Sequence, residues 1–205
     1  MATLERDSIP SEDLARILDV AGQLLPDEAA LLWGLARSTT EGCIVEVGSF
    51  RGRSATALAL GALAGHGAPV YAVDPHEPFV SVLGGRFGPA DRKAFFENTL
   101  RAGVVEAIRL VNLSSEVVAP GWNRPVGLLW LDGDHTYEGV ARDWRAWRPH
   151  LLPRAAVAFH DSNDPQLGPA RLIGEIVSEG QHAVETRVGL TTVLRAGPVV
   201  RRGDP

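Results

Sequence analysis

The chain has 205 residues, of which 45% are hydrophobic and 22% charged, values that fit one globular domain and exclude both a largely disordered chain and two full domains. Its net charge of −5 argues against binding to nucleic acid phosphates, and its single cysteine, Cys43, excludes an intrachain disulfide and a thiolate zinc cluster. No apolar run reaches the roughly 18 to 20 residues of a bilayer span, and the acidic, proline-containing start lacks the apolar stretch of a signal peptide, so we expect a cytoplasmic protein with no membrane span.

The N-terminal segment, residues 1–40, predicts two helices. Ser11 to Leu25 begins with an N-cap signal and an acidic first turn, and its apolar residues then recur at helical spacing. Pro26 stands where a second helix begins, and the apolar pattern continues to about Arg37. We expect this segment to act as a lid or as the dimer element of a homodimer.

From Cys43 onward, short apolar runs alternate with longer helical patterns. The sequence predicts strands at CIVEVG, PVYAVD, AIRLVN, VGLLWLD and AAVAFHD, and helices over 53–64, 90–102, 136–148 and beyond Pro165. Two last strands, HAVETRV and LTTVLRA, are separated only by Gly189. This alternation implies an α/β domain over 41–198, with a mostly parallel sheet covered by helices on both faces and an antiparallel C-terminal strand pair, followed by a tail at 199–205. The loop at 75–89, rich in proline and glycine, is expected to be irregular and to overhang a site.

A strand-to-helix junction, EVGSFRGRS from Glu46 to Ser54, carries the first candidate site. Gly48 and Gly52 allow a tight turn and the close approach of a ligand, and the following helix offers free amides to a carboxylate or phosphate. The dinucleotide fingerprint GxGxxG is absent, and the single lysine fits neither a Walker loop nor a short-chain dehydrogenase. The next strand ends in Asp74, an acid placed to accept hydrogen bonds from both hydroxyls of a ribose. Together these features favour an adenosine-containing ligand.

The glycine loop, the acid one strand later and the order of elements resemble a class I S-adenosylmethionine-dependent methyltransferase, which has a Rossmann-like fold. The resemblance covers about residues 43–196 and implies S-adenosylmethionine as the cofactor. It implies that the methionine end of the cofactor is bound by the junction residues Glu46, Gly48, Ser49, Gly52 and Ser54. It also implies Asp74 as the ribose acid and places Ser114, in LVNLSSE, beside the adenine.

Acidic and imidazole side chains follow two further strands, in WLDGDHTYEG and AFHDSND. Because the carboxyl ends of parallel strands open on one edge, we expect these groups near one crevice. Asp132 and Asp161 offer oxygen ligands to a divalent cation, and His160 offers a third ligand. Consecutive strand residues face opposite ways, so His160 and Asp161 can both coordinate only if the backbone turns there. Structural interpretations stay open: Asp161 as a cap, Asp134 closing an Asx turn, and His160 as a semi-buried imidazole.

The stretch from DGDHTYEG to AFHD resembles the small metal-dependent methyltransferases that act on sugar hydroxyls of glycans and glycosylated natural products. The resemblance implies a cation at Asp132, His160 and Asp161, with Asp132 and His135 as catalytic residues and His135 as the base. His160 replaces a carboxylate of that group, and imidazole suits manganese better than magnesium, so either ion is expected. The predicted reaction is methyl transfer to a hydroxyl of a small-molecule sugar or of a glycan, which is an oligosaccharide, a polysaccharide or a glycosylated natural product. The alternatives are a phenolic or catechol acceptor and a cofactor-binding module without turnover.

Overall fold

The computed structural model of the chain describes residues 8–196, so the first residues of the predicted N-terminal segment and the predicted tail at 199–205 lie outside the described residues. The helices are α1 Ser11–Asp19, α2 Pro26–Arg37, α3 Arg53–Ala64, α4 Pro89–Arg101, α5 Ser115–Val118, α6 Tyr137–Trp147 and α7 Gly168–Ser178. The strands of the main sheet are β1 Cys43–Val47, β2 Val70–Val73, β5 Ile108–Val111, β6 Val126–Leu131, β7 Leu151–Phe159, β8 His182–Val188 and β9 Thr191–Ala196. A separate hairpin comprises β3 Phe79–Val80 and β4 Arg86–Phe87, and short 3-10 turns lie at Val105–Ala107, Ala119–Gly121 and Arg148–His150.

The main sheet has seven strands in the order β5-β2-β1-β6-β7-β9-β8. Neighbours from β5 to β7 run parallel, whereas β9 is antiparallel to both β7 and β8. The chain moves outward from β1 to β2 and β5, and then returns to place β6 on the other side of β1. Such a reversal of strand order leaves a crevice at the carboxyl ends of the strands. The predicted mostly parallel sheet with an antiparallel C-terminal strand pair is confirmed.

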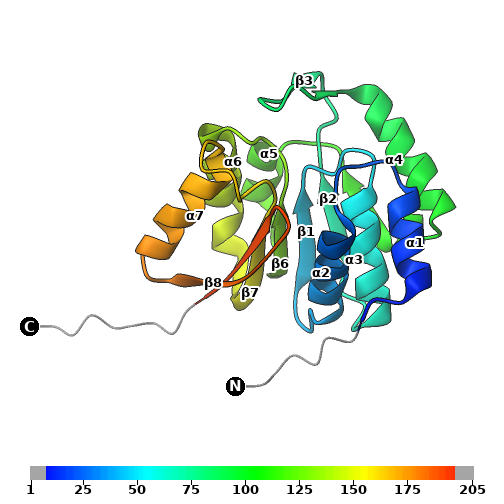
Figure 1. Cartoon of the computed structure of the whole chain (residues 1–205), viewed down its shortest axis with the longest axis horizontal. Coiled ribbons are helices and arrows are strands. Elements are labelled where there is room, and N and C mark those ends of the chain that lie inside the picture. Colours follow the sequence, from blue (N-terminus) through cyan, green and yellow to red (C-terminus); the bar gives the residue numbers. More distant parts are fainter. Residues whose placement is uncertain (1–7, 197–205) are drawn as a thin grey trace, which may run out of the picture.

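Helices cover both faces of this sheet (Figure 1), and the alternation of side chains along each strand decides which helices each residue meets. On one face Ile44, Leu128 and Trp130 pack with residues of α1, α2 and α3. On the other face Val45 and Leu129 pack with residues of α6 and α7. Fully burying an apolar side chain contributes about 1.5–3 kcal/mol. The two apolar layers therefore hold the strand ends, and the groups that follow them, in fixed positions.

The first helix is shorter than predicted, because α1 ends at Asp19 and not at Leu25. Val20 is already extended, with ψ 129°. The reason lies in α3, where Arg53 donates from Nε to the Val20 carbonyl at 2.6 Å and from Nη1 to the Leu24 carbonyl at 3.0 Å. In a longer helix these carbonyls would accept backbone N–H groups of the next turn. A guanidinium from a distant part of the sequence replaces that turn.

The loop at 75–89 was predicted to be irregular, and this prediction is wrong in part. Within the loop, β3 and β4 form a short antiparallel hairpin with Phe79 opposite Phe87. Strands of two residues are too short to leave an alternating pattern in the sequence. The hairpin stands above the sheet in Figure 1, and its residues line the cavity described below.

Between residues 8 and 196, no helix is long and apolar enough to cross a membrane.

Candidate active site and metal centre

A cavity of about 390 Å³ opens at the carboxyl ends of β1, β2, β6 and β7. Strand tips form its floor, and its walls come from the α1–α2 connection at 21–24 and from the β3–β4 hairpin. It therefore lies at the reversal of strand order, which is where α/β sheets bind ligands. The sequence-based expectation that the 75–89 loop overhangs a site agrees with this position.

The glycine loop after β1 passes directly against the end of β6. Gly48 has φ 82°, and a Cβ atom at this position would lie 2.3 Å from the carbonyl oxygen of Asp132. Only glycine tolerates both this backbone conformation and this approach. Gly52 has φ 92° and precedes the first turn of α3. The loop thus aims the N-terminus of α3 at the cavity region and places it beside the strand end that carries Asp132.

Asp74, at the end of β2, holds the glycine loop in place. Its Oδ2 accepts hydrogen bonds from the backbone N–H groups of Ser49 at 2.8 Å and Phe50 at 3.0 Å. Its Oδ1 accepts the N–H of His76 at 2.8 Å, and His76 itself adopts a left-handed φ of 49°. A carboxylate has about four lone-pair sites, so these bonds leave room for further donors. Asp74 lines the cavity while also shaping its floor.

The structure brings most of the predicted cofactor residues to the cavity. The residues that line it are Gly48, Ser49, Ser54, Asp74 and Ser114. Gly52 and Glu46 do not line it. Glu46 lies on the same strand face as Ile44 and is fully buried, and neither of its carboxylate oxygens has a hydrogen-bond partner among the described residues. Burial raises the pKa of Glu46 well above its ordinary value, the nearby Ser54 opposes this rise, and the acids Asp132 and Asp74 add to it.

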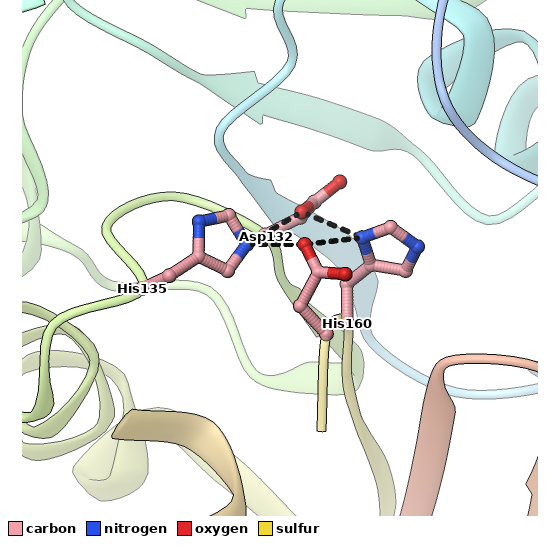
Figure 2. Close-up of side chains that lie close together, drawn as sticks. Asp132, His135 and His160 are labelled. Carbon is pink, nitrogen blue, oxygen red and sulfur yellow. Dashed lines mark hydrogen bonds and ion pairs between the residues drawn. The ribbon is translucent and has the colours of Figure 1, made fainter. Parts of the chain in front are cut away.

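Four side chains converge at the ends of β6 and β7, and Figure 2 shows Asp132, His135 and His160 pointing toward one another. One donor atom from each of Asp132, His135, His160 and Asp161 lies within 4.8 Å of the others. His160 Nδ1 lies 3.1 Å from Asp132 Oδ1 and 3.5 Å from Asp161 Oδ2. His135 Nε2 lies 3.4 Å from Asp132 Oδ1 and 3.0 Å from Asp161 Oδ2. The three predicted metal ligands and the predicted base therefore surround one point.

A left-handed residue makes this convergence possible. His160 and Asp161 are consecutive, and Asp161 has φ 46°, which is uncommon for a residue with a side chain. The backbone turns at this position, so both side chains face the same point. Strained residues of this kind cost of order 1–3 kcal/mol and concentrate at functional sites. Asp134 closes an Asx turn by accepting the Thr136 N–H at 2.9 Å, one of the structural roles left open by the sequence.

The charges at this centre are strongly coupled. Burial disfavours the imidazolium forms, but the contacts with Asp132 and Asp161 outweigh it and raise the pKa of His135 to about 9 and that of His160 to about 12. Burial alone would raise the pKa of both carboxyl groups, but the two histidines hold the pKa of Asp132 and of Asp161 below the ordinary value. These shifts favour protonated imidazoles beside ionised carboxylates at this centre.

The donor set fits a divalent cation. Ligand atoms about 2.1 Å from an ion and at right angles around it lie about 3 Å apart, and the four imidazole–carboxylate distances are 3.0 to 3.5 Å. His135 Nε2 is buried and close to both carboxylates, yet it is aligned for a hydrogen bond with neither. A cation at this point can replace the two imidazole protons without changing the balance of charge.

One residue of the site, Glu28 in α2, was not predicted from the sequence. Its carboxylate is fully buried, and its Oε2 lies 3.5 Å from Nε2 of His160. The one indication in the sequence was the position of this glutamate on the apolar face of α2, one turn before the buried Leu32. The sequence offers no indication that this face meets the end of β7.

Comparisons with known proteins identify the family and the fold of the domain. A sequence model of the methyltransferase domain family matches residues 45–162. The O-methyltransferase from Bacillus cereus, in complex with S-adenosylhomocysteine, has a TM-score of 0.68 and 18% identity, with 92% of this chain and 93% of that chain covered. TomG of Streptomyces achromogenes, an O-methyltransferase involved in tomaymycin synthesis and bound to S-adenosylmethionine, has a TM-score of 0.63 and 17% identity, covering 93% and 92%.

A further similar structure is CalS11, a TDP-rhamnose 3'-O-methyltransferase of calicheamicin biosynthesis, with a TM-score of 0.62 and 19% identity over 93% of this chain and 88% of that chain. At such identities the likeness establishes a shared fold. The predicted Rossmann-like fold, preceded by N-terminal helices, is therefore confirmed.

Proposed function

The chain belongs to the methyltransferase domain family, and we propose that it transfers the methyl group of S-adenosylmethionine to a sugar or glycan hydroxyl beside a divalent cation. The observation that carries this proposal is the contact between two sites. Gly48 of the glycine loop lies against the backbone of Asp132, so the cofactor cavity adjoins the cluster of carboxylates and imidazoles. A methyl donor and a cation held at these positions are close neighbours.

For the cofactor, we propose that the free N–H groups at the start of α3 and the loop residues Gly48, Ser49 and Ser54 hold its methionine end. Asp74 accepts hydrogen bonds from the ribose hydroxyls, and Ser114 lies beside the adenine. S-Adenosylmethionine supplies an electrophilic methyl group when bound. Glu46 and Gly52 do not line the cavity, and we propose them as further residues of the cofactor site on the resemblance alone.

For the cation, we propose Asp132, His160 and Asp161 as ligands and magnesium or manganese as the ion, with the imidazole favouring manganese. A divalent cation lowers the pKa of an adjacent hydroxyl and so makes its oxygen a better nucleophile. His135, 11% exposed at the edge of the cluster, accepts the proton. A positioned base of this kind contributes a factor of roughly 10² to 10⁴.

The sugar acceptor is supported by the resemblance of the DGDHTYEG stretch to sugar O-methyltransferases and by the likeness to CalS11. The β3–β4 hairpin and the connection at 21–24 line the cavity and are the segments we assign to acceptor selection. We further propose that residues 1–40 close over a methyltransferase domain at 41–198 or form the contact of a homodimer. Light scattering of the purified chain tests the homodimer.

One experiment tests the reaction. The purified protein is incubated with S-adenosylmethionine, Mg²⁺ or Mn²⁺, and a panel of glycosides, nucleotide sugars and catechols, and S-adenosylhomocysteine release is measured. We expect turnover with a sugar acceptor, its loss after dialysis against EDTA and its recovery on adding the cation. Turnover on catechols alone favours the phenolic acceptor. Cofactor binding by calorimetry without turnover on any acceptor favours a binding module, and EDTA-resistant turnover contradicts the cation.

A further inference from the structure

Glu28 is a carboxylate buried at the junction of three parts of the fold. Its Oε2 accepts the backbone N–H of Leu25 at 2.9 Å, at the start of α2. Its Oε1 accepts the backbone N–H of Leu190 at 2.7 Å and the hydroxyl of Thr191 at 3.1 Å, at the turn between β8 and β9. Glu28 is fully buried. An uncompensated carboxylate in such a position costs several kcal/mol, so its surroundings must favour the charged form.

The imidazole of His160 lies between Glu28 and the carboxylate cluster. The ring is 4% exposed, and its Nδ1 faces Asp132 and Asp161 at 3.1 and 3.5 Å. Its Nε2 is buried, has no hydrogen-bond partner among the described residues, and lies 3.5 Å from Glu28 Oε2. The indole of Trp130 packs against the ring, with centroids 5.4 Å apart. The ring therefore presents one nitrogen to the cluster and the other to Glu28.

We propose that Glu28 is a positioning residue of the metal centre: its carboxylate accepts the Nε2 proton of His160 and thereby keeps Nδ1 free to bind the cation. This inference rests on the cation site of the proposed function. Metal-binding histidines commonly donate their second ring N–H to a carboxylate, which fixes the tautomer and the orientation of the ring. Here that carboxylate comes from a helix that precedes the sheet, so α2 is part of the centre and not only a cover for it.

The alternative is that Glu28 only caps α2 and the β8–β9 turn. An amide affects both roles, because glutamine has one acceptor oxygen and one NH₂ group in place of two oxygens, so the tautomer of His160 is what distinguishes them. If the NH₂ group faces His160, it also opposes the N–H of Leu25 at the start of α2, and Nε2 must accept, so the ring proton moves to Nδ1, the atom needed by the cation. If the oxygen faces His160, the NH₂ group opposes the N–H of Leu190, and the turn between β8 and β9 has to shift.

The test compares Glu28→Gln with Asp27→Asn, a matched carboxylate-to-amide change at the exposed neighbouring position in the first turn of α2. Mn²⁺ affinity is measured from the electron paramagnetic resonance signal of the free ion, without cofactor or acceptor. We expect Glu28→Gln to weaken Mn²⁺ binding about 10- to 100-fold and Asp27→Asn to leave it unchanged. Thermal melts of the metal-free variants show whether each is folded.

A second measurement needs no variant at this position. Long-range ¹H–¹⁵N spectra of the wild type, loaded with Zn²⁺ as a diamagnetic probe, report the tautomer of each histidine, and His160→Gln assigns the signal. We expect His160 to carry its proton on Nε2. A proton on Nδ1, or equal Mn²⁺ affinity of Glu28→Gln and the wild type, overturns the role of Glu28 alone. Failure of the wild type to bind Mn²⁺ overturns the cation site together with this inference.

Discussion

At the scale of residues, the proposed centre exchanges protons for a cation. In the metal-free protein the raised pKa values of His135 and His160, about 9 and about 12, keep both rings protonated at neutral pH. A protonated imidazole cannot accept a proton from an acceptor hydroxyl. His135 can therefore serve as a base only when a cation takes over the negative charge of Asp132 and Asp161. The role proposed for His135 as a base therefore depends on the binding of the proposed cation.

Replacing His135 with alanine separates a base from a metal ligand. We expect kcat to fall at least about a hundredfold, because a positioned base supplies roughly that factor, while Mn²⁺ affinity is retained or rises, because the ring proton no longer competes with the cation. His66→Ala, at an exposed position after α3, is the control. The measurements are initial rates at saturating cofactor and a Mn²⁺ titration. An equal loss in both would instead make His135 a fourth ligand, as its place among the donor atoms allows.

Asp143, in α6 beside the cavity, gives a prediction for stability. Burial raises its pKa from 3.8 to about 6, opposed by a hydrogen bond with Ser115. The folded state thus binds this proton more tightly than the unfolded state, so stability falls as pH rises from about 4 through 6. The full difference corresponds to roughly 3 kcal/mol. Asp143→Asn removes the titrating group, so the variant does not undergo this loss of stability as pH rises.

Urea unfolding of wild type and Asp143→Asn, both in EDTA, checks this at pH 4.5 and pH 7.5. The difference between the two proteins isolates Asp143 from other titrating groups. We expect the variant to gain about 2 kcal/mol relative to the wild type between these pH values, because part of the full difference is already lost at pH 4.5. Parallel pH dependence of the two proteins is the contrary result and means that Asp143 is ionised without cost.

At the scale of elements, Arg53 ties the N-terminal helices to the site. Its guanidinium, in the first turn of α3, donates to the carbonyls of Leu18, Val20 and Leu24. The connection at 21–24 that it holds is a wall of the cavity. A positively charged side chain at a helix N-terminus interacts unfavourably with the helix dipole. The stabilisation that Arg53 provides therefore comes from these three hydrogen bonds.

We expect Arg53→Met to lower the free energy of unfolding by about 2–4 kcal/mol, because three partly buried carbonyls lose their partner. Arg109→Met, at an exposed position on the edge strand β5, is the control and is expected to change it by less than about 0.5 kcal/mol. Chemical denaturation measures both. Limited proteolysis should cut first in the connection at 21–24 of Arg53→Met, and a cleavage pattern like that of the wild type argues against this anchoring.

Most elements could be predicted from the sequence because their patterns are local. The Trp144 and Trp147 stripe marked α6, and the apolar runs marked each strand of the main sheet. The end of α1 could not be predicted, because Arg53 decides it from another helix. The proximity of Asp132 and Asp161 could also be predicted. The alternation of strands and helices implies parallel strands, and the carboxyl ends of parallel strands lie at one edge of the sheet.

Other parts of the site depend on tertiary contacts that no local pattern carries. The left-handed backbone at Asp161 lets His160 and Asp161 face one point. It could not be predicted, because no glycine marks this position in the sequence. The contact between Glu28 and His160 depends on the packing of α2 beside α3 and on the position of the end of β7. Glu46, predicted as a cofactor contact, is fully buried and is not among the residues that line the cavity, so its contact with the cofactor stays a prediction.

At the scale of the whole molecule, the proposed cation joins segments that are distant in sequence. Asp132 follows β6, Asp161 follows β7, and His160 contacts α2 through Glu28. A ligand that binds only when these segments are assembled stabilises the folded state by mass action, by about 2.7 kcal/mol at a concentration of 100 times Kd. Cation binding should therefore be visible as stability, without any cofactor or acceptor.

We expect Mn²⁺ at 100 times its Kd to raise the Tm of EDTA-treated protein by about 5–10 °C, since a domain of this size shifts by roughly 2–4 °C per kcal/mol. Asp161→Asn should lose most of this shift, because it removes one carboxylate of the cluster. Asp164→Asn, an exposed acid of the same loop, should retain it. Scanning fluorimetry over a Mn²⁺ titration gives all three values. An equal shift in Asp161→Asn would mean that Mn²⁺ binds elsewhere on the surface, and the hydroxyl acceptor would then need another source of activation.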